Sequence, residues 1–390
     1  MQSVATLAGA AMRVYDKVVH EQVFTKNVLF QNILSNVAQS NGSTTKYFSV
    51  HYGRNVGSAA GSETLTLPTA GSQKYMQASI PMKYNFHTIS LTDVSLQASK
   101  KSKEFLVNVL ESEYSGAKED MQRQLSRQGY GIGTGAIAIV TSVTGTTVVL
   151  EQPMVGANPT DYIEVGNTLR FGATAADIGV VASITDGTTF ELVAGVGTAG
   201  DAVYIARSAT ESNIDAEMMG LKGLIDDGTN VNVLETINRT DNIWWKSYVN
   251  SAGTVRAVTD ALLHTTFLEA KKKGDPKYAL TSFDVYSTYG QLLTPDRRYT
   301  DTMKLKGGFT GVAFNSMPVI ADYDCPVDEW YFIDNSTMSC EDLAPMSFLN
   351  EDGAILDRSS TTPAWNATLR YYANLAIKAP NKSSALRDIQ

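Results

Sequence analysis

The glycine-rich segment Gly129-Tyr-Gly-Ile-Gly-Thr-Gly135 has the clearest potential for chemistry, because closely spaced glycines can cradle the phosphates of a dinucleotide. That function requires a strand before the glycines and a helix after them, so that a helix N-terminus meets the pyrophosphate. Here a helical pattern precedes the glycines and a Val/Ile-rich strand pattern follows them. The inverted order favours a flexible hinge over a nucleotide site.

Metal binding finds little support in the spacing of the potential ligands. The chain has four histidines, His20, His51, His87 and His264. No two of them are three or four residues apart, as a helical metal pair would require. The acidic residues within 322–329 could hold a hard cation, but no twelve-residue loop with acids at alternate positions surrounds them. A solvated loop is the preferred interpretation, and no metal or other cofactor is predicted.

Catalytic motifs are also missing from the sequence. It contains no Gly-x-Ser-x-Gly elbow, no Walker loop and no His-Glu-x-x-His. The adjacent Trp244 and Trp245 could stack on a sugar or a base, but large aromatic residues more often lie in a core or an interface. Cys325 and Cys340 could pair, yet two cysteines make neither a disulfide framework nor a zinc site. The chain is therefore predicted not to be an enzyme.

The composition is that of a globular chain. Its 390 residues suffice for one large or two to three ordinary domains, and 43% of them are apolar. The net charge of −8 argues against a nucleic-acid reader, which normally carries a basic stripe. The N-terminus lacks the basic and long apolar regions of a signal peptide, and no run approaches the ~18 apolar residues of a membrane span. We expect a soluble protein that is made and used inside a cell.

The first 130 residues divide into three parts. Residues 1–46 are expected to form an arm with one or two short helices. Residues 47–90 are expected to form a long two-stranded hairpin, because the second half alternates between apolar and polar residues from Met76 to Phe86. Residues 98–128 carry an apolar stripe at helical spacing with charged residues elsewhere, which predicts an unusually long helix.

The composition changes sharply after Gly131. No lysine occurs from there to Thr210, and Val, Ile, Thr and Gly dominate. The segments 139–150 and 180–192 resemble each other, and each is typical of a strand, a tight glycine turn and a second strand. Residues 131–210 are therefore predicted to be a small all-β insert, a barrel or a sandwich. The insert contributes seven acidic and two basic residues.

The remainder of the chain mixes helices and strands. The apolar spacing from Val255 to Ala270 predicts a helix that Gly274 ends. A short strand is expected at 278–281, and Thr281 with Asp284 could form the capping box of the next helix. Residues 365–377 alternate strictly, which predicts a strand longer than usual.

This order of elements resembles the major capsid fold that tailed-phage shells share with encapsulins and with the floor of the herpesvirus capsid. The local sequences that carry the resemblance are 89–98, 278–286, 305–312, 317–322 and 346–353, followed by the Trp365 strand. The resemblance covers the chain except 131–210, and it implies the α+β tailed-phage major capsid fold. The family's division of the chain would then be an N-terminal arm at 1–46, an extended hairpin loop at 47–90, a peripheral domain with its spine helix at 91–130 and 346–390, an inserted β-barrel or sandwich at 131–210, and an axial domain at 211–345.

The resemblance implies a structural subunit that self-assembles into the icosahedral shell around a phage genome. The protein would be part of the virion capsid and would assemble in the host cytoplasm. Its partners would be itself in hexamers and pentamers, a separate scaffolding protein, a portal protein, a decoration protein and packaged double-stranded DNA held by non-specific contacts; no membrane is involved. Two alternatives stay open: an encapsulin-like compartment shell, and a β-rich carbohydrate-binding or hydrolytic protein.

The hairpin is where we expect subunits to meet. Its apolar face is predicted to be covered by the spine helix of a neighbouring subunit, because an isolated two-stranded ribbon is marginally stable at best. The residues predicted to make this contact are Arg54, Lys74, Met76, Ile80, Met82 and Phe86.

Overall fold

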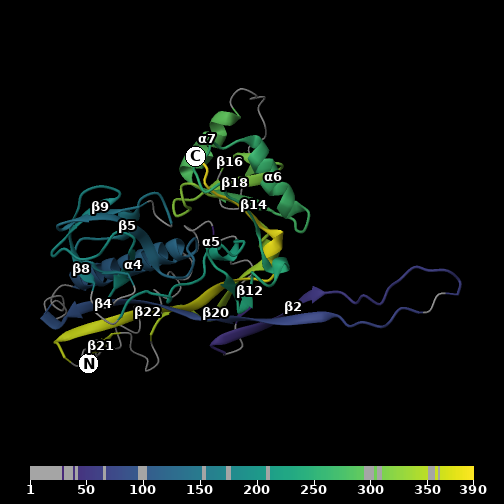
Figure 1. The fold of residues 1–390 in the computed structure, drawn as a ribbon. Helices are drawn as coiled ribbons and strands as arrows, with labels where there is room; N and C mark the ends of the chain where they lie inside the picture. Colours follow the sequence, from purple (N-terminus) through teal and green to yellow (C-terminus); the bar gives the residue numbers. More distant parts are fainter. Residues whose placement is uncertain are drawn as a thin grey trace.

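The computed structural model describes residues 29, 38–39, 43–64, 67–94, 103–151, 155–172, 177–207, 211–293, 303–304, 310–349, 356–358 and 361–390. Most of the predicted arm at 1–46, and parts of the segments 305–312 and 346–353, lie outside these residues. A long sheet forms the base of the molecule, two further units stand on one side of it, and a hairpin projects from one end (Figure 1). None of the helices in these ranges is long and apolar enough to cross a membrane.

The base is a sheet built around one long strand. Its strands are β1 (Ala38–Gln39), β20 (Met338–Phe348), β22 (Ala364–Ile377), β21 (Asp357–Arg358) and β4 (Lys83–Thr92). Strand β22 has 14 residues and pairs with β20 and β4, so the long final strand predicted from the alternation is confirmed. The odd-numbered residues of β22 from Ala367 to Ile377 are buried, which places the core on one face of the sheet.

The predicted long helix is also present. Helix α4 (Lys103–Gln128) has 26 residues and a length of about 39 Å at ~1.5 Å per residue. It packs on β4, and its described apolar stripe is buried: Tyr114, Ala117, Met121 and Leu125. Spacing by three or four residues puts these side chains on one face, which explains why the pattern identified the helix.

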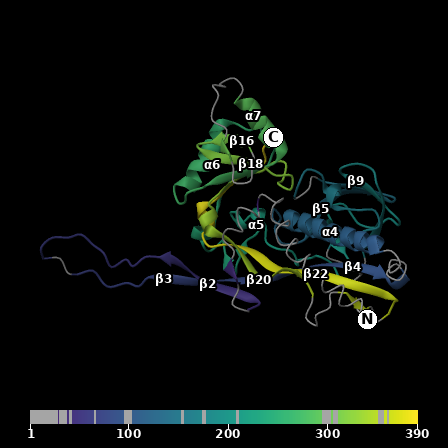
Figure 2. The same cartoon turned by 180° about the vertical axis from the view of Figure 1, so that it is seen from behind.

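The projecting hairpin consists of β2 (Thr45–Gly53) and β3 (Lys74–Pro81), joined by a loop that extends far beyond the body (Figures 1 and 2). It is shorter than predicted, because the chain leaves the ribbon at Met82 and continues as β4 in the base sheet. The buried positions are even-numbered up to Met82 and odd-numbered from Asn85 onward. The prediction that Met76 and Phe86 share one face is therefore wrong.

The six strands between the spine helix and residue 207 close into a barrel. They are β5 (Ala136–Thr144), β6 (Thr147–Leu150), β7 (Thr168–Phe171), β8 (Ile178–Ile184), β9 (Thr189–Leu192) and β10 (Ala202–Ala206). Strands β5 and β6 turn at Gly145, whose φ of 65° suits glycine, and β8 pairs with β9. Phe171 and Phe190 fill the interior. The two strand–turn–strand units follow the sequence pattern. That the barrel is an insertion stays a prediction.

The third unit is a six-stranded sheet with two helices. In spatial order its strands are β13 (Tyr248–Asn250), β23 (Ser384–Leu386), β19 (Trp330–Ile333), β14 (Tyr278–Thr281), β18 (Met317–Ala321) and β17 (Ala313–Phe314). The helices are α6 (Asp260–Lys271) and α7 (Phe283–Leu292). Because β23 joins this sheet, the assignment of all of 346–390 to the peripheral domain needs correction for this strand.

The ends of the helices in this unit also differ from the prediction. Thr259 caps α6, so Val255 and Val258 precede the helix. Ser282 caps α7 by accepting from the Val285 N–H at 3.3 Å. Thr281, the predicted cap, is the last residue of β14, and its hydroxyl donates to the Glu329 carbonyl.

Short elements connect these units. They are α5 (Leu221–Leu224), β11 (Val233–Leu234), β12 (Ile237–Asn238), β15 (Met303–Lys304), β16 (Thr310–Gly311), and the 3-10 turns η2 (Pro159–Tyr162), η3 (Ile243–Trp245), η4 (Asn335–Thr337) and η5 (Pro380–Lys382).

Candidate assembly surfaces

The root of the hairpin rests on residues 233–245 of its own chain, which we call the pedestal. The Ser79 N–H of β3 donates to the Glu235 carbonyl at 3.0 Å. The Tyr52 ring of β2 stacks on Trp244, with ring centroids 5.2 Å apart and planes inclined by 15°. These contacts mean that the subunit itself sets the direction in which the hairpin leaves the body.

The tryptophan pair of the pedestal is structural. Trp245 is buried and donates its indole N–H to the Leu234 carbonyl at 3.2 Å. Trp244 is covered by Tyr52. The pair therefore packs against the chain's own residues, as the core or interface interpretation predicts, and the carbohydrate-binding alternative loses one of its two supporting features, leaving only the β-rich segment.

The structure separates the six residues predicted to contact a neighbour. Ile80 and Met82 are only 1% and 4% exposed within their own subunit, so the prediction is wrong for both. Met76 is half-buried and packs against the main core. Their apolar face needs no neighbour, because the pedestal and the base sheet already cover it. Arg54 and Lys74 are exposed where the loop begins and ends, and their role stays a prediction.

The sixth residue, Phe86, belongs to a different surface. It lies on the outer face of β4, opposite to α4, and is 44% exposed. Its ring meets Tyr372 of β22 edge to face at 5.5 Å, and Tyr84 meets the same ring at 5.1 Å. The guanidinium of Arg370 lies 5.7 Å from the Tyr372 centroid. The base sheet thus presents an exposed aromatic cluster on this face.

The loop of the hairpin leaves apolar side chains in solvent. Val56 and Leu67 are each 87% exposed. The Asn55 side chain holds the two branches of the loop together by accepting from the N–H groups of Gly57 and Gly71, at 2.8 and 3.0 Å. The loop is therefore organised internally while its apolar side chains lack cover from their own chain.

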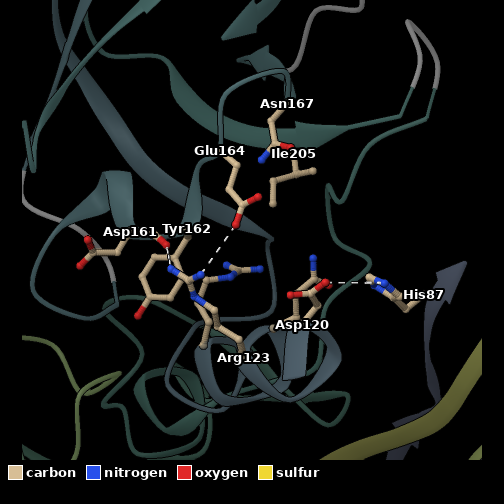
Figure 3. A pocket seen from close by; sticks show the side chains of 10 residues that line it. His87, Asp120, Arg123, Asp161, Tyr162, Glu164, Asn167 and Ile205 are labelled. Carbon is tan, nitrogen blue, oxygen red and sulfur yellow. Dashed lines mark hydrogen bonds and ion pairs between the residues drawn. The ribbon is translucent and has the colours of Figure 1, made fainter. Parts of the chain in front are cut away.

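A polar cleft separates the spine helix from the barrel (Figure 3). Arg123 of α4 reaches across it, donating to the Asp161 carbonyl and pairing with Glu164 at 3.8 Å. On the helix side, His87 and Asp120 lie 3.8 Å apart. Positive and negative groups compensate each other within the cleft. Its arrangement fits a fixed contact between helix and barrel better than a site for a charged ligand.

A second junction ties the barrel to the six-stranded sheet. The Tyr162 hydroxyl donates to Asp324 Oδ1 at 2.6 Å, and the Tyr323 hydroxyl donates to Asp161. Burial, helped by the nearby Asp324 charge, raises the pKa of Asp322 to about 6. This segment is not the solvated loop that the sequence predicts, because hydrogen bonds hold its carboxylates inside the junction.

The same acidic segment contributes Glu329 to a buried network of ion pairs that was not predicted from the sequence. Glu329 is 1% exposed; it accepts from Lys222 at 2.7 Å and lies 3.5 Å from Arg387. Arg387 also bonds Asp226 at 2.9 Å. Among the described residues, no three His, Cys, Asp or Glu side chains form a group that could hold a metal ion. The charges in this network compensate one another, so removing a single partner would leave a buried charge unpaired.

The fold is that of a phage capsid protein. A chain of the cyanophage A-1(L) capsid asymmetric unit superposes with a TM-score of 0.59 at 12% identity, and the match covers 93% of both chains. The α+β major capsid fold predicted from the order of elements is thereby confirmed.

Two other solved structures resemble the chain less closely. They are the capsid of a native GTA particle (TM-score 0.47, 10% identity, 93% of this chain and 90% of that one) and the SrpI encapsulin complex from Synechococcus elongatus (0.46, 10%, 94% and 89%). No protein-family model matches the sequence, and neither does any curated protein.

Proposed function

We propose that this chain is the structural subunit of an icosahedral capsid shell that encloses a phage genome. The observation that carries the proposal is the match to a phage capsid chain over 93% of both lengths. The protein would act by self-assembly into hexamers and pentamers, in the virion capsid, after assembly in the host cytoplasm. Its proposed partners are a separate scaffolding protein, a portal protein and DNA that is bound non-specifically.

The hairpin loop is the proposed clasp between subunits. The support is physical: Val56 and Leu67 are uncovered in the subunit, and burying such side chains contributes about 1.5–3 kcal/mol each. The contact surface would therefore be the loop from Arg54 to Lys74, and not the covered strand face. A neighbouring subunit, over whose spine helix the loop would lie, supplies the cover.

The barrel is proposed to lie on the outer face of the shell. Its segment contributes seven acidic and two basic residues, and an acidic module next to packaged DNA would be repelled. A decoration protein would bind on the same face.

The test deletes Arg54–Ser72 and joins the branches through Asn-Gly. The described residues of the deleted segment, 54–64 and 67–72, are exposed or half-buried, so the melting temperature of the subunit should stay nearly unchanged. Shell formation with scaffolding protein, followed by sedimentation and electron microscopy, should be blocked or strongly weakened. Val56→Ser combined with Leu67→Ser is the milder variant, and Val165→Ser on the barrel is its matched control, because Val165 is also well exposed.

Three outcomes would contradict the proposal. A strictly monomeric wild-type protein under every scaffolded condition would exclude a shell subunit. Unfolding of the deletion variant would make the loop part of the core. Undiminished shells from that variant would exclude the loop as the clasp. Shells that incorporate a cellular cargo and no genome would favour the encapsulin-like alternative.

A further inference from the structure

The strand ladder of the hairpin ends well before its tip. Strands β2 and β3 are paired as far as Gly53 and Lys74, and the loop between them projects away from the body (Figures 1 and 2). A free loop samples many conformations, and binding it in one of them costs conformational entropy. A contact that joins the two branches of the loop before binding therefore lowers the cost of using the loop as a contact surface.

The side chain of Asn55 makes such a contact. Its oxygen Oδ1 accepts from the Gly57 N–H on the same branch at 2.8 Å and from the Gly71 N–H on the opposite branch at 3.0 Å. The first bond closes a turn around Val56. The second joins residues that are 16 positions apart. A single oxygen thus fixes Val56 relative to the returning branch.

The two glycines leave the space that this oxygen needs. A Cβ atom on Gly71 would lie 2.6 Å from Asn55 Oδ1, and one on Gly57 would lie 3.0 Å from it. Neither glycine has a positive φ, so the backbone conformation alone does not require glycine at these positions. The close approach of the Asn55 side chain requires it. The seat of Oδ1 is therefore built from both branches.

The second exposed apolar residue of the loop is constrained through the same bond. Leu67 precedes Pro68 on the branch that leads to Gly71. The proline ring fixes its own φ and restricts the preceding residue to extended backbone. Holding Gly71 therefore limits the positions that Leu67 can take relative to Val56.

We propose that Asn55 is a positioning residue of the clasp: its side-chain oxygen joins the two branches of the free loop, so that Val56 and Leu67 are already arranged for contact with a second copy of this chain. The inference rests on the proposed role of the loop as the clasp between subunits. It adds that the affinity of the clasp depends on a residue that sets the shape of the loop and need not touch the partner.

The expected size of the effect follows from exposure. Asn55 is exposed, so water competes for both of its hydrogen bonds and each bond contributes at the low end of the usual range. Together they should change the population of the joined loop on the order of tenfold. An equal factor should appear in the subunit concentration needed for assembly, because the unjoined loop must be ordered on binding.

Nitrogen-15 relaxation of the free subunit tests the contact without assembly. In the wild type, the amides of Gly57 and Gly71 should have order parameters near those of rigid backbone, about 0.85, and in Asn55→Leu these should fall below about 0.6. Asn55→Asp keeps an oxygen that accepts both bonds, so it should retain the wild-type values. Ser58→Ala, at another exposed position of the loop, is the matched control. Mobile glycine amides in the wild type, or equal values in the Leu and Asp variants, would overturn the proposal.

Assembly with scaffolding protein measures the consequence for the clasp. The critical subunit concentration should rise about tenfold in Asn55→Leu and stay close to that of the wild type in Asn55→Asp and Ser58→Ala. The melting temperature of the subunit should be the same in all four proteins, because the loop lies outside the core. Assembly of Asn55→Asp that is as weak as that of Asn55→Leu would contradict the role of the oxygen.

A double-mutant cycle tests the seat itself. Gly71→Ala places its Cβ against Asn55 Oδ1, so it should weaken assembly about as much as Asn55→Ala does. In the double variant the obstructing oxygen is gone, and Gly71→Ala should add less than about a twofold change. Losses that multiply in the double variant would show that the two residues act independently, and would overturn the proposal.

The loop-deletion variant distinguishes this inference from the proposed function. If deletion blocks shells while Asn55→Leu assembles like the wild type, the loop is the clasp and Asn55 does not position it. If deletion leaves shells undiminished, the loop is not the clasp, and the positioning role in assembly fails with it. The relaxation result for Gly57 and Gly71 would still stand in that case as a property of the free loop.

Discussion

Asn374 of β22 holds Pro81, the last residue of β3, through a side-chain N–H that donates to the Pro81 carbonyl at 2.8 Å. The oxygen of the same side chain accepts from the Met219 N–H at 3.0 Å. Pro81 is followed by Met82, where the buried face changes from even to odd positions. A single buried amide therefore fixes the point at which the hairpin leaves the base sheet.

Replacing this amide should destabilise the subunit markedly. In Asn374→Leu, the Pro81 carbonyl and the Met219 N–H both lose a partner, and each unsatisfied buried group costs about 1–3 kcal/mol. We expect the free energy of unfolding to fall by roughly 2–4 kcal/mol in urea denaturation. Asn366→Leu is the control on the same strand, because Asn366 is half-buried on the outer face, and it should change stability far less. Equal losses in both variants would contradict the role of Asn374.

The ion pair between Arg127 of α4 and Glu217 should behave as a buried pair. Both side chains are nearly inaccessible, so removing one charge leaves the other without compensation. Arg127→Met should lower the free energy of unfolding by about 3–5 kcal/mol, and adding Glu217→Leu should restore a large part of it. Chemical denaturation of the two single variants and the double variant measures the coupling. Strict additivity would show that the pair does not act as a unit.

The elements that sequence patterns predicted well are those with one buried face. Helix α4 buries Tyr114 and Met121 on one side, and β22 buries its odd positions, so helical and alternating periods are visible in the sequence. The change of the buried positions from even to odd numbers after Met82 could not be seen in the sequence, because Tyr84 and Phe86 continue the alternation of apolar residues. Their rings lie on the outer face instead, where Tyr372 contacts them.

The pedestal and the buried charges were not predictable from local sequence. Ser79 and Thr236, whose hydroxyls meet at the hairpin root, are 157 positions apart, and no period marks the segment around Thr236. Whether an acidic side chain is exposed to solvent also depends on residues that are far away in the sequence. Glu329, for example, contacts Lys222 and Arg387. Such contacts arise only from the tertiary fold, so the sequence suggested an exposed acidic loop where the structure has a junction.

The turn between β17 and β18 offers a stabilising substitution. Asn315 and Ser316 connect the two strands with φ values of 46° and 64°, which two-residue hairpins prefer to fill with Asn-Gly. Ser316→Gly should relieve the strain and raise the free energy of unfolding by about 0.5–1 kcal/mol, seen as a higher melting temperature. Ser316→Val should do the reverse. A lower melting temperature for the glycine variant would show that the Ser316 side chain makes a net contribution.

The barrel should fold when separated from the rest of the chain. It is closed and has its own apolar core around Leu169, Phe171 and Phe190. Residues 131–210 expressed alone should give a β-type circular dichroism spectrum and a cooperative thermal transition. Phe190→Ala should abolish that transition or lower its midpoint strongly, because truncating a buried Phe costs about 3–5 kcal/mol. A random-coil spectrum for the isolated wild-type segment would mean that α4 and the junction at Asp324 hold the barrel in shape.

The junction around Asp322 should make the stability of the subunit depend on pH. Burial raises the pKa of Asp322 to about 6, so its stabilising contribution is complete below about 4 and is lost as the pH rises through 6. We expect the free energy of unfolding of the wild type to fall by roughly 1 kcal/mol between pH 5 and 7, relative to Asp322→Asn, which cannot ionise. Urea midpoints at pH 5, 6 and 7 measure this difference.

A matched control separates this junction from acidic residues in general. Asp275 is exposed, and hydrogen bonds from Lys271 and Lys277 lower its pKa to about 2, so its charge is constant between pH 5 and 7. Asp275→Asn should therefore keep the wild-type slope of stability against pH, while Asp322→Asn flattens it. Because Tyr162 of the barrel donates to Asp324 in the same junction, Tyr162→Phe should lower stability at every pH in this range. Parallel slopes for the wild type and Asp322→Asn would mean that Asp322 is already ionised at pH 5, and that the junction does not respond to protons.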